Sequence, residues 1–384
     1  MNRNRCGRRW AAALLVLLPC GCAYPPSSEP VSAIVQPAPR PALAAARDRQ
    51  ITLFGELPRR GEVPYAGRAG GSLLQHTFTR EGADFDCRLD NGGDRFVFAS
   101  TRHSLHPDLY IKSVSGRTVV QLTSDPSSDI QPVFSPDDQR VAFASNRTGN
   151  WDIWVMDVDG RRPVQVTNTP MDEVHPSWSS DGGRLVYSAL PQTSGQWELW
   201  ISPAEPSTTP SFIGYGVFPE WSPIDDTILF QRARQRGSRW FSIWTIQLKG
   251  GEPLYPTEIT ASADLAMILP SWSRDGQWIA YTTVSDTSEN TSDFGGGYEV
   301  ADIWVIDADG GSRVRLTDGY TGNFGPAWSP DGRLFFTSSR SGHENIWSAV
   351  PVLHTGPMQT SIGTLSANDT PGQAAVRPAS SDGS

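Results

Sequence analysis

The chain has 384 residues, of which 38% are hydrophobic, enough for one large domain or two average ones. Its formal net charge is −9. Such an acidic balance argues against a partner held through phosphate contacts, so no nucleic-acid partner is expected. Three of the four cysteines lie in the first 22 residues. Cys87 is then alone, so we expect a buried small hydrophobe and no disulfide framework.

Residues 1–22 are typical of a secretory leader. Four arginines precede an apolar stretch at 10–18, which is too short to span a bilayer because a spanning helix needs about 20 residues. The cysteines that follow resemble the lipobox of bacterial lipoproteins. Cys22, preceded by Gly21, is the predicted acylation site; Cys20 is the alternative, and an ordinary signal peptide is another. Acylation would anchor the protein to a membrane from the periplasm, with the outer membrane expected.

One short phrase recurs six times along the chain, most clearly as Asp152-Ile153-Trp154. Its aromatic positions are Tyr110, Trp154, Trp200, Trp244, Trp304 and Trp347, which are 44, 46, 44, 60 and 43 residues apart. Periods of this length are typical of propeller blades. The sequence therefore predicts an all-β fold, a six-bladed β-propeller of four-stranded antiparallel blades.

The second repeat shows the parts of a blade most clearly. Strands are expected at 131–134, 140–145, 153–158 and 164–167, and a Ser-Pro-Asp-Asp type I turn joins the first two. The intact Ser-Pro-Asp-Gly turn recurs at 329–332, with degraded copies at 89–92, 179–182 and 273–276; all are interpreted as structural. The last repeat supplies only three strands, whereas residues 74–77 match a fourth. An N-terminal strand is therefore expected to complete the last blade and close the ring.

These observations divide the chain into four parts. Residues 1–22 form the leader, and 23–71 form a Pro/Ala-rich tether and lead-in. The propeller is expected over 72–355. Residues 356–384 are rich in small and polar residues, and we expect them to be disordered.

The repeat has the form P-x-[FW]-S-P-D-G, then F-x-S-x-R, then [DN]-I-[WY]. Over about residues 72–352 it resembles the WD40-like Pro-Asp repeat of periplasmic TolB-type propellers. The resemblance implies a periplasmic, envelope-associated protein whose propeller mouth holds another protein. TolB also carries an α/β domain before its propeller, and the stretch between tether and first blade is too short for one.

The first strand of each blade lines the channel of a propeller, so the equivalent residues of the six first strands can be compared. Their start positions are Asp84, Asp129, Glu173, Gly216, Met267 and Asn323. Two residues further on, the equivalents are Asp86, Gln131, His175, Phe218, Leu269 and Gly325. This mouth is expected to be acidic at the first three blades and apolar at the next two. We predict that an envelope protein or peptide with basic and apolar groups is bound by Asp84, Asp86, Asp129, Glu173, His175, Phe218, Met267 and Asn323.

Other interpretations of the same positions remain open. The carboxylates would cap backbone N–H groups at strand starts, or would hold Ca²⁺, although no EF-hand spacing occurs and no metal or cofactor is predicted. His175 alone is more typical of a hydrogen-bonded channel residue. Two loops fall on the same rim: one carries Arg232, Arg234, Arg236 and Arg239, and the other is the insertion 285–300. Both are interpreted as solvated loops or partner contacts.

The sequence lacks the common hydrolase signatures. No G-x-S-x-G elbow occurs, His343-Glu344 has no second histidine at zincin spacing, and no Gly-rich phosphate loop is found. The expected function is therefore that of a non-enzymatic, monomeric, lipid-anchored scaffold in envelope integrity or transport. The alternative is a propeller enzyme or glycan-binding protein that uses acidic channel residues as acid/base groups.

Overall fold

The computed structural model describes residues 51–52, 55–56, 73–206, 209–233, 241–285, 301–317, 319 and 321–353. The predictions for Cys20, Cys22, the leader, the tail at 356–384 and the insertion beyond Ser285 lie outside these residues, as does most of the tether. A short hairpin joins β1 (Ile51–Thr52) to β2 (Gly55–Glu56). No helix in the described part of the chain is long and apolar enough to cross a membrane.

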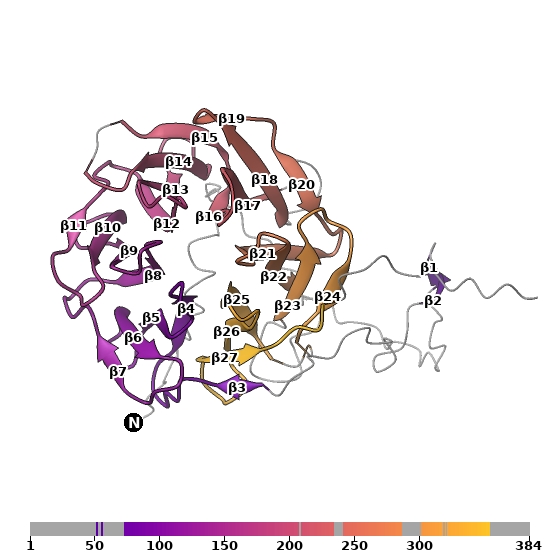
Figure 1. Ribbon diagram of the computed structural model, residues 1–384, viewed down its shortest axis with the longest axis horizontal. Helices are drawn as coiled ribbons and strands as arrows, with labels where there is room; N and C mark the ends of the chain where they lie inside the picture. The colour runs from indigo at the N-terminus through magenta and orange to yellow at the C-terminus, as the bar shows by residue number, and fades with distance from the viewer. Residues whose placement is uncertain are drawn as a thin grey trace, which may run out of the picture. The chain divides into compact units, whose positions relative to one another are not determined.

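Six antiparallel sheets follow one another along the chain as the blades of a propeller (Figure 1). Blade one is β4 (Asp84–Leu89), β5 (Arg95–Ser100), β6 (Asp108–Ser113) and β7 (Val119–Gln121). Blade two is β8 (Asp129–Phe134), β9 (Arg140–Ser145), β10 (Asp152–Asp157) and β11 (Val164–Gln165). Blade three is β12 (Asp172–Trp178), β13 (Arg184–Leu190), β14 (Glu198–Pro203) and β15 (Ser211–Tyr215).

Blade four is β16 (Val217–Trp221), β17 (Thr227–Ala233) and β18 (Phe241–Lys249), with β19 (Glu252–Pro253) and β20 (Thr257–Thr260) both paired to β18. Blade five is β21 (Leu265–Trp272), β22 (Trp278–Ser285), β23 (Ala301–Asp307) and β24 (Arg313–Arg315). Blade six is β25 (Asn323–Trp328), β26 (Leu334–Ser338), β27 (Asn345–Ala349) and the N-terminal β3 (Leu74–Gln75). The predicted six-bladed fold is confirmed.

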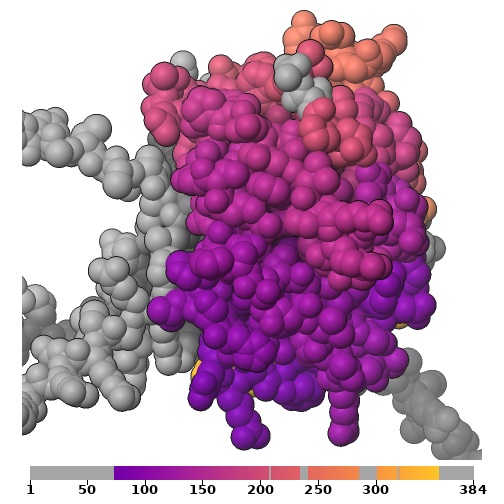
Figure 2. All heavy atoms as spheres, turned by 90° about the vertical axis from the view of Figure 1, so that its left-hand side faces the viewer, coloured from indigo at the N-terminus to yellow at the C-terminus, as the bar shows by residue number. Residues whose placement is uncertain are grey.

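The ring closes through the N-terminal strand, as predicted. In β3, Gln75 pairs with Trp347 of β27, and the backbone N–H of His76 donates to Ile346 O over 2.8 Å. The first strands contact one another around the ring, with β25 against β4. Closure by a strand from the opposite end of the sequence leaves blade six without an unpaired fourth position. Figure 2 views the outer rim of the ring, with the first half of the chain toward the viewer.

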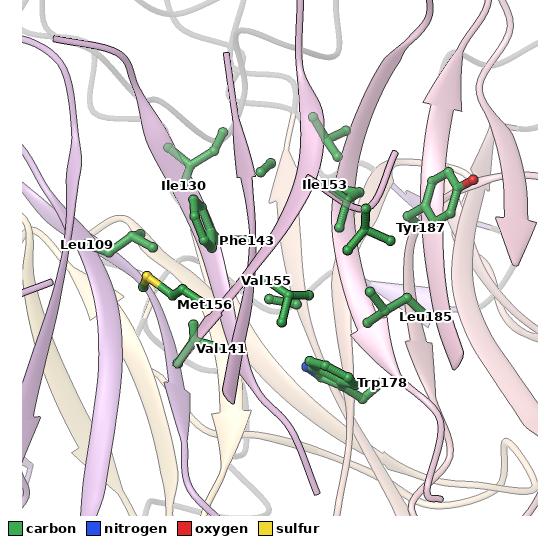
Figure 3. Packing of buried hydrophobic residues seen from close by; sticks show 14 of the residues in the cluster. Leu109, Ile130, Val141, Phe143, Ile153, Val155, Met156, Trp178, Leu185 and Tyr187 are labelled. Carbon is green, nitrogen blue, oxygen red and sulfur yellow. The ribbon is translucent and has the colours of Figure 1, made fainter. Parts of the chain in front are cut away.

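The blades are held together by apolar residues between the sheets. The middle residue of every repeated phrase is 0% exposed: Leu109, Ile153, Leu199, Ile243, Ile303 and Ile346. Figure 3 shows this packing around Ile153 and Phe143, where branched and aromatic side chains from neighbouring blades interdigitate. Burial of such side chains contributes about 1.5–3 kcal/mol each, so these six positions help to hold every pair of neighbouring blades together.

Candidate functional site

Each first strand contains a β-bulge at its centre. The register to the second strand shifts there in all six blades. We call the six residues with left-handed backbone at these shifts the bulge ring: Asp86, Gln131, His175, Phe218, Leu269 and Gly325, with φ between 53° and 60°. Five of them are not glycine, a conformation that persists only where the surroundings fix it. Sequence alignment predicted these six positions as equivalent, and their shared backbone confirms it.

Side chains on neighbouring blades hold the bulge ring in place. The Asp86 carboxylate accepts the backbone N–H of Gln131, and Gln131 Oε1 accepts that of His175 over 2.9 Å. Gln231 Oε1 accepts the N–H of Leu269 over 2.7 Å. These bonds satisfy backbone donors that the bulges remove from the sheet, so part of the ring is structural.

The bulge ring lines a small cavity of about 50 Å³, which also contacts Arg88 and Glu220. The structure thus brings Asp86, His175 and Phe218 together. The ring centroids of His175 and Phe218 lie 3.6 Å apart. Burial raises the pKa of Asp86 to about 6 and lowers the pKa of His175 well below its usual value. His175 Nδ1 has no hydrogen-bond partner among the described residues. Whether these groups contact a partner stays a prediction.

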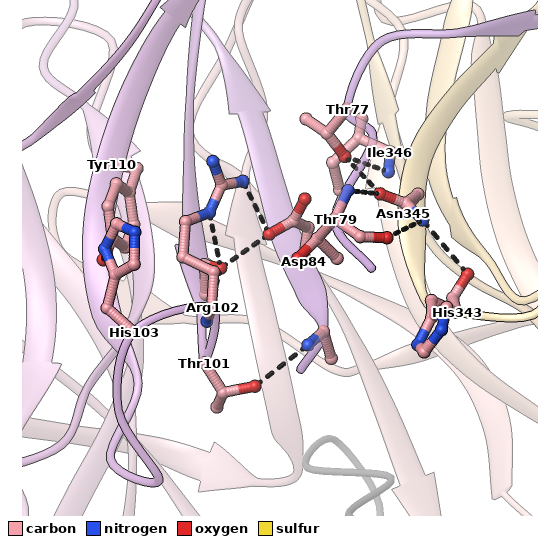
Figure 4. A network of polar contacts seen from close by, with 12 residues as sticks. Thr77, Thr79, Asp84, Thr101, Arg102, His103, Tyr110, His343, Asn345 and Ile346 are labelled. Carbon is pink, nitrogen blue, oxygen red and sulfur yellow. Dashed lines mark hydrogen bonds and ion pairs between the residues drawn. The ribbon is translucent and has the colours of Figure 1, made fainter. Parts of the chain in front are cut away.

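The carboxylates at the strand starts of blades one and two are buried within their own blades, whereas they were expected to contact a partner at the channel mouth. Asp84 and Asp129 are 0% exposed. Asp84 accepts Ser100 Oγ at 2.6 Å and Arg102 Nη2 at 2.8 Å (Figure 4). Asp129 accepts Arg147 Nη2 at 2.9 and 3.0 Å. The serine and arginine of the F-x-S-x-R motif therefore neutralise the carboxylate within the same blade, because a buried charge needs a partner.

Two further predicted mouth residues are also buried. Asn323 is 0% exposed and accepts Ser338 Oγ at 2.8 Å, so it occupies the place of Asp84 and Asp129 in blade six. Met267 is 1% exposed and packs in the core with Leu229 and Trp272. Neither side chain is available to a partner at the surface. Arg232 stacks over Trp244 at 5.5 Å, while Arg234, Arg236 and Arg239 lie outside the described residues.

Glu173 differs from the other strand-start acids because its blade has no arginine of the motif. Its register partner is Ala189, and Pro191 stands where blades one and two have arginine. Glu173 is 0% exposed, accepts Thr169 Oγ1 and adjoins Asp152. Burial raises its pKa to about 7. The side chain is therefore a buried acid that changes charge near neutral pH.

Replacing Glu173 by glutamine is expected to remove part of the pH dependence of stability. Because the folded-state pKa lies above the unfolded value, ionisation of Glu173 destabilises the fold as pH rises from about 4.5 to 7. Glu173→Gln is expected to be more stable than the wild type at pH 8 by roughly 2 kcal/mol, and close to it at pH 4.5. Urea unfolding at both pH values measures this; parallel pH profiles of the two proteins would contradict it.

A larger concavity opens at the other end of the first strands, where they enter the Ser-Pro-Asp-Gly turns. We call it the turn-end hollow. It has a volume of about 310 Å³, and residues from all six blades line it. Four tryptophans at the ends of first strands contribute: Trp178, Trp221, Trp272 and Trp328. Arg88, Glu220 and Arg274 are its charged residues.

Charged side chains cross the hollow between blades that are not neighbours. Arg88 Nη2 of blade one lies 3.8 Å from Glu220 Oε2 of blade four. Arg274 of blade five donates to Asn91 Oδ1 over 2.7 Å and to Leu89 O over 3.2 Å, both in blade one. Burial raises the pKa of Glu220, and burial also lowers the pKa of Arg274. The hollow is therefore a polar centre within an aromatic wall.

Sequence reasoning did not find this hollow, although a signal was present. Arg274 replaces the proline of the Ser-Pro-Asp-Gly turn, and Asn91 lies in the most degraded copy of that turn. Arg88 and Glu220 occupy one equivalent position, two residues after the bulge, where other blades have Val133 or Ser177. The sequence interprets the altered turns as degraded structural copies, whereas the structure brings these departures from the repeat together in one hollow.

The described residues contain no group of three or more His, Cys, Asp and Glu side chains that could hold a metal ion. Cys87 is fully buried, in agreement with its predicted role as a small hydrophobe, and burial raises its pKa.

The fold defines a class, a six-bladed propeller that surrounds a central polar hollow. Residues 76–243 match the model of the TolB beta propeller domain family. The chain therefore carries a TolB-type six-bladed β-propeller.

Relatives and solved structures extend this likeness. An uncharacterized protein of Agrobacterium fabrum is 31% identical over 136 residues, which span 35% of this chain and 38% of that relative. A structure assigned to TolB from Agrobacterium tumefaciens has a TM-score of 0.54 at 19% identity, covering 73% of this chain and 97% of its own. A gluconolactonase from Xanthomonas campestris has a TM-score of 0.51 at 12% identity, covering 73% and 89%. Because a TolB and an enzyme share this fold, function has to be argued from the site.

Proposed function

We propose that this protein is a non-enzymatic binding scaffold of the bacterial periplasm, whose turn-end hollow holds a segment of another envelope protein. The observation that carries the proposal is the convergence of all six blades on this one hollow of about 310 Å³. Arginine, which lines it as Arg88 and Arg274, is among the residue types that most often dominate binding energy at interfaces. The leader sequence supports export, and Cys22 is proposed as the lipid anchor.

The burial of the channel acids supports a scaffold over an enzyme or a glycan-binding protein. Asp84 and Asp129 are each occupied by an arginine, and Glu173 is inaccessible. A general acid or base has to reach the substrate. The tryptophans offer no open ring faces for sugars either, because Arg140 covers Trp178 at 4.8 Å and Arg184 covers Trp221 at 4.6 Å.

Photo-crosslinking tests the location of the partner. A benzoylphenylalanine in place of Ser180, which is exposed at the hollow, is expected to yield a discrete adduct with one envelope protein in intact cells. The matched control places the same group at Leu105, which is 88% exposed in the loop between β5 and β6, at the strand-start end of the blades.

An adduct at Leu105 with none at Ser180 would move the binding site to the opposite mouth and refute the proposal for the hollow. Fractionation of the same cells tests the anchor, because Cys22→Ser is expected to release the protein from the membrane fraction. Unchanged fractionation would refute acylation of Cys22.

A further inference from the structure

The turn-end hollow contains hydrogen-bond donors on its tryptophan and arginine residues. The indole Nε1 atoms of Trp221, Trp272 and Trp328 have no hydrogen-bond partner among the described residues. The guanidinium groups of Arg88 and Arg274 add further donors. These indole nitrogens are buried, so a ligand in the hollow meets the guanidinium donors, which favour a ligand that brings acceptors.

The one carboxylate that lines the hollow is engaged through one oxygen only, because its Oε2 has no hydrogen-bond partner among the described residues. Glu220 Oε1 accepts Trp272 N–H over 2.8 Å and Ser271 Oγ over 3.1 Å. Its Oε2 lies 3.8 Å from Arg88 Nη2, beyond hydrogen-bond distance. Arg88 uses Nη1 to donate to Cys87 O. A guanidinium has five N–H donors, so Arg88 retains the capacity to bind an incoming anion.

Arg88 and Arg274 lie close enough to influence each other. Burial lowers the pKa of Arg274, the charges of Glu220, Asp138 and Asp90 raise it, and the charge of Arg88 lowers it by the smallest contribution. Two cations that line one hollow repel each other, and an anion between them relieves this repulsion. Glu220 does so incompletely, because its Oε2 lies 3.8 Å from Arg88 Nη2 and makes no hydrogen bond with the described residues.

The size and wall of the hollow limit the source of the anion. A volume of about 310 Å³ is at the lower end for ligand pockets, and it suits one or two amino-acid residues. The four tryptophans are at most 8% exposed, which leaves no ring face on which a sugar could stack. A peptide carboxylate satisfies both limits, whereas an acidic glycan would need a stacking platform.

We propose that the turn-end hollow binds a carboxylate of the partner segment, supplied by an acidic side chain or by a chain terminus, between Arg88 and Arg274. This proposal rests on the proposed function and names the chemical group that the partner presents. It reverses the sequence-based expectation of a basic partner, because the accessible charges of the site are guanidinium groups rather than carboxylates.

The test compares matched small probes on the full-length protein in detergent. N-acetyl-leucine and N-acetyl-leucinamide differ only in the carboxylate. In protein with ¹⁵N-labelled tryptophan, the acid is expected to shift the indole resonances of Trp221, Trp272 and Trp328, assigned by single Trp→Phe variants. The amide is expected to bind at least about tenfold more weakly, because a charge-assisted hydrogen bond is lost. A tenfold change in affinity corresponds to about 1.4 kcal/mol of binding free energy. N-acetyl-aspartamide, whose only carboxylate is on its side chain, distinguishes the two sources.

Arginine variants locate the effect. Arg88→Gln and Arg274→Gln are each expected to abolish the preference for the acid, and Arg88→Lys is expected to keep part of it. Arg140→Gln is the control, because Arg140 belongs to the same face but bonds Glu205 and stacks on Trp178. The comparison of acid with amide in the wild type needs no variant, so a misfolded variant does not decide the result.

Equal shifts with acid and amide would overturn the proposal. Stronger binding of inorganic phosphate or trigalacturonate than of N-acetyl-leucine at the same resonances would also overturn it, in favour of a different class of anion. The outcome is separable from that of the proposed function. An adduct at Ser180 without a preference for the acid would support the hollow as the partner site and contradict the proposal that it binds a carboxylate. Binding of the carboxylate probe without an adduct at Ser180 would contradict the proposal that a partner protein occupies the hollow.

Discussion

Replacing Asp129 by alanine is expected to lower the free energy of unfolding by about 3 kcal/mol. Asp129 is 0% exposed and holds Arg147, whose Nη2 lies 2.9 Å from Asp129 Oδ1. Removal of one partner leaves a largely buried guanidinium, and this costs about 3–5 kcal/mol in other proteins. The lower end is expected because Arg147 also contacts Asp125 at 2.9 Å. Urea denaturation at pH 7 measures the loss.

Asparagine at the same position is the matched control. Blade six carries Asn323 at the equivalent place, and its Oδ1 accepts Ser338 Oγ at 2.8 Å and Arg340 Nη2 at 3.2 Å. Asp129→Asn is therefore expected to cost only about 1 kcal/mol, a loss typical of one weakened hydrogen bond. If both variants were as stable as the wild type, Asp129 would not be a structural residue, and the strand-start acids would again be candidates for partner binding.

The fold was predictable because each repeated position has the same physical task in every blade. The middle residue of the phrase, such as Ile153 or Ile346, is always fully buried. The aromatic residue after it is half-buried in five blades and buried in blade one, and the arginine of the F-x-S-x-R motif covers it in several blades, as with Arg147 over Trp154 at 4.7 Å. Both constraints leave residue types that can be recognised in sequence. The closing strand was predictable for the same reason, since Thr77 matches Thr167.

The site was not predictable because bulges interrupt the alternation of side chains along the first strands. A bulge adds one residue, so the positions after it change the face they present. Only Gly325 marks a bulge by its residue type; Asp86 and Leu269 give no such signal. Comparison of the equivalent strand starts placed the Asp84 carboxylate at the mouth, whereas Ser100 and Arg102 draw it into the blade.

The same bulges conceal the turn-end hollow from sequence analysis. Arg88 and Glu220 are 132 residues apart and on opposite blades, and only the closed ring brings them within 3.8 Å. Arg274 and Asn91 are separated by 183 residues. Pairings of this kind depend on the number of blades and on closure, so no local pattern encodes them.

Closure of the ring depends on the short strand β3 and on its bonds to Asn345. Replacing Asn345 is therefore expected to have a large effect on the free energy of unfolding. β3 has only two residues, and side-chain bonds from Asn345 strengthen its attachment (Figure 4). Asn345 Oδ1 accepts Thr79 N–H over 2.7 Å and Thr77 Oγ1 over 3.2 Å, and Nδ2 donates to Thr79 O over 3.3 Å. Thr77 Oγ1 also accepts the N–H of Ile346 over 2.9 Å. Asn345→Ala leaves several of these groups unpaired, and we expect a loss of about 3 kcal/mol.

Asp302 provides the control, since it makes equivalent bonds to the fourth strand of blade five, together with an ion pair to Arg315. Its Oδ1 accepts Thr317 Oγ1 over 2.7 Å and Gly319 N–H over 2.9 Å. There the fourth strand follows directly in the chain, so its detachment does not open the ring. In blade six the bonded residues are 266 apart or more, and the entropy of closing that loop is lost together with the bonds. Asn345→Ala is therefore expected to accelerate amide hydrogen exchange at His76 and Thr77 and throughout blade six, whereas Asp302→Ala is expected to affect blade five alone. Equal local effects of the two variants would show that β3 completes the sheet of blade six without stabilising the closed ring.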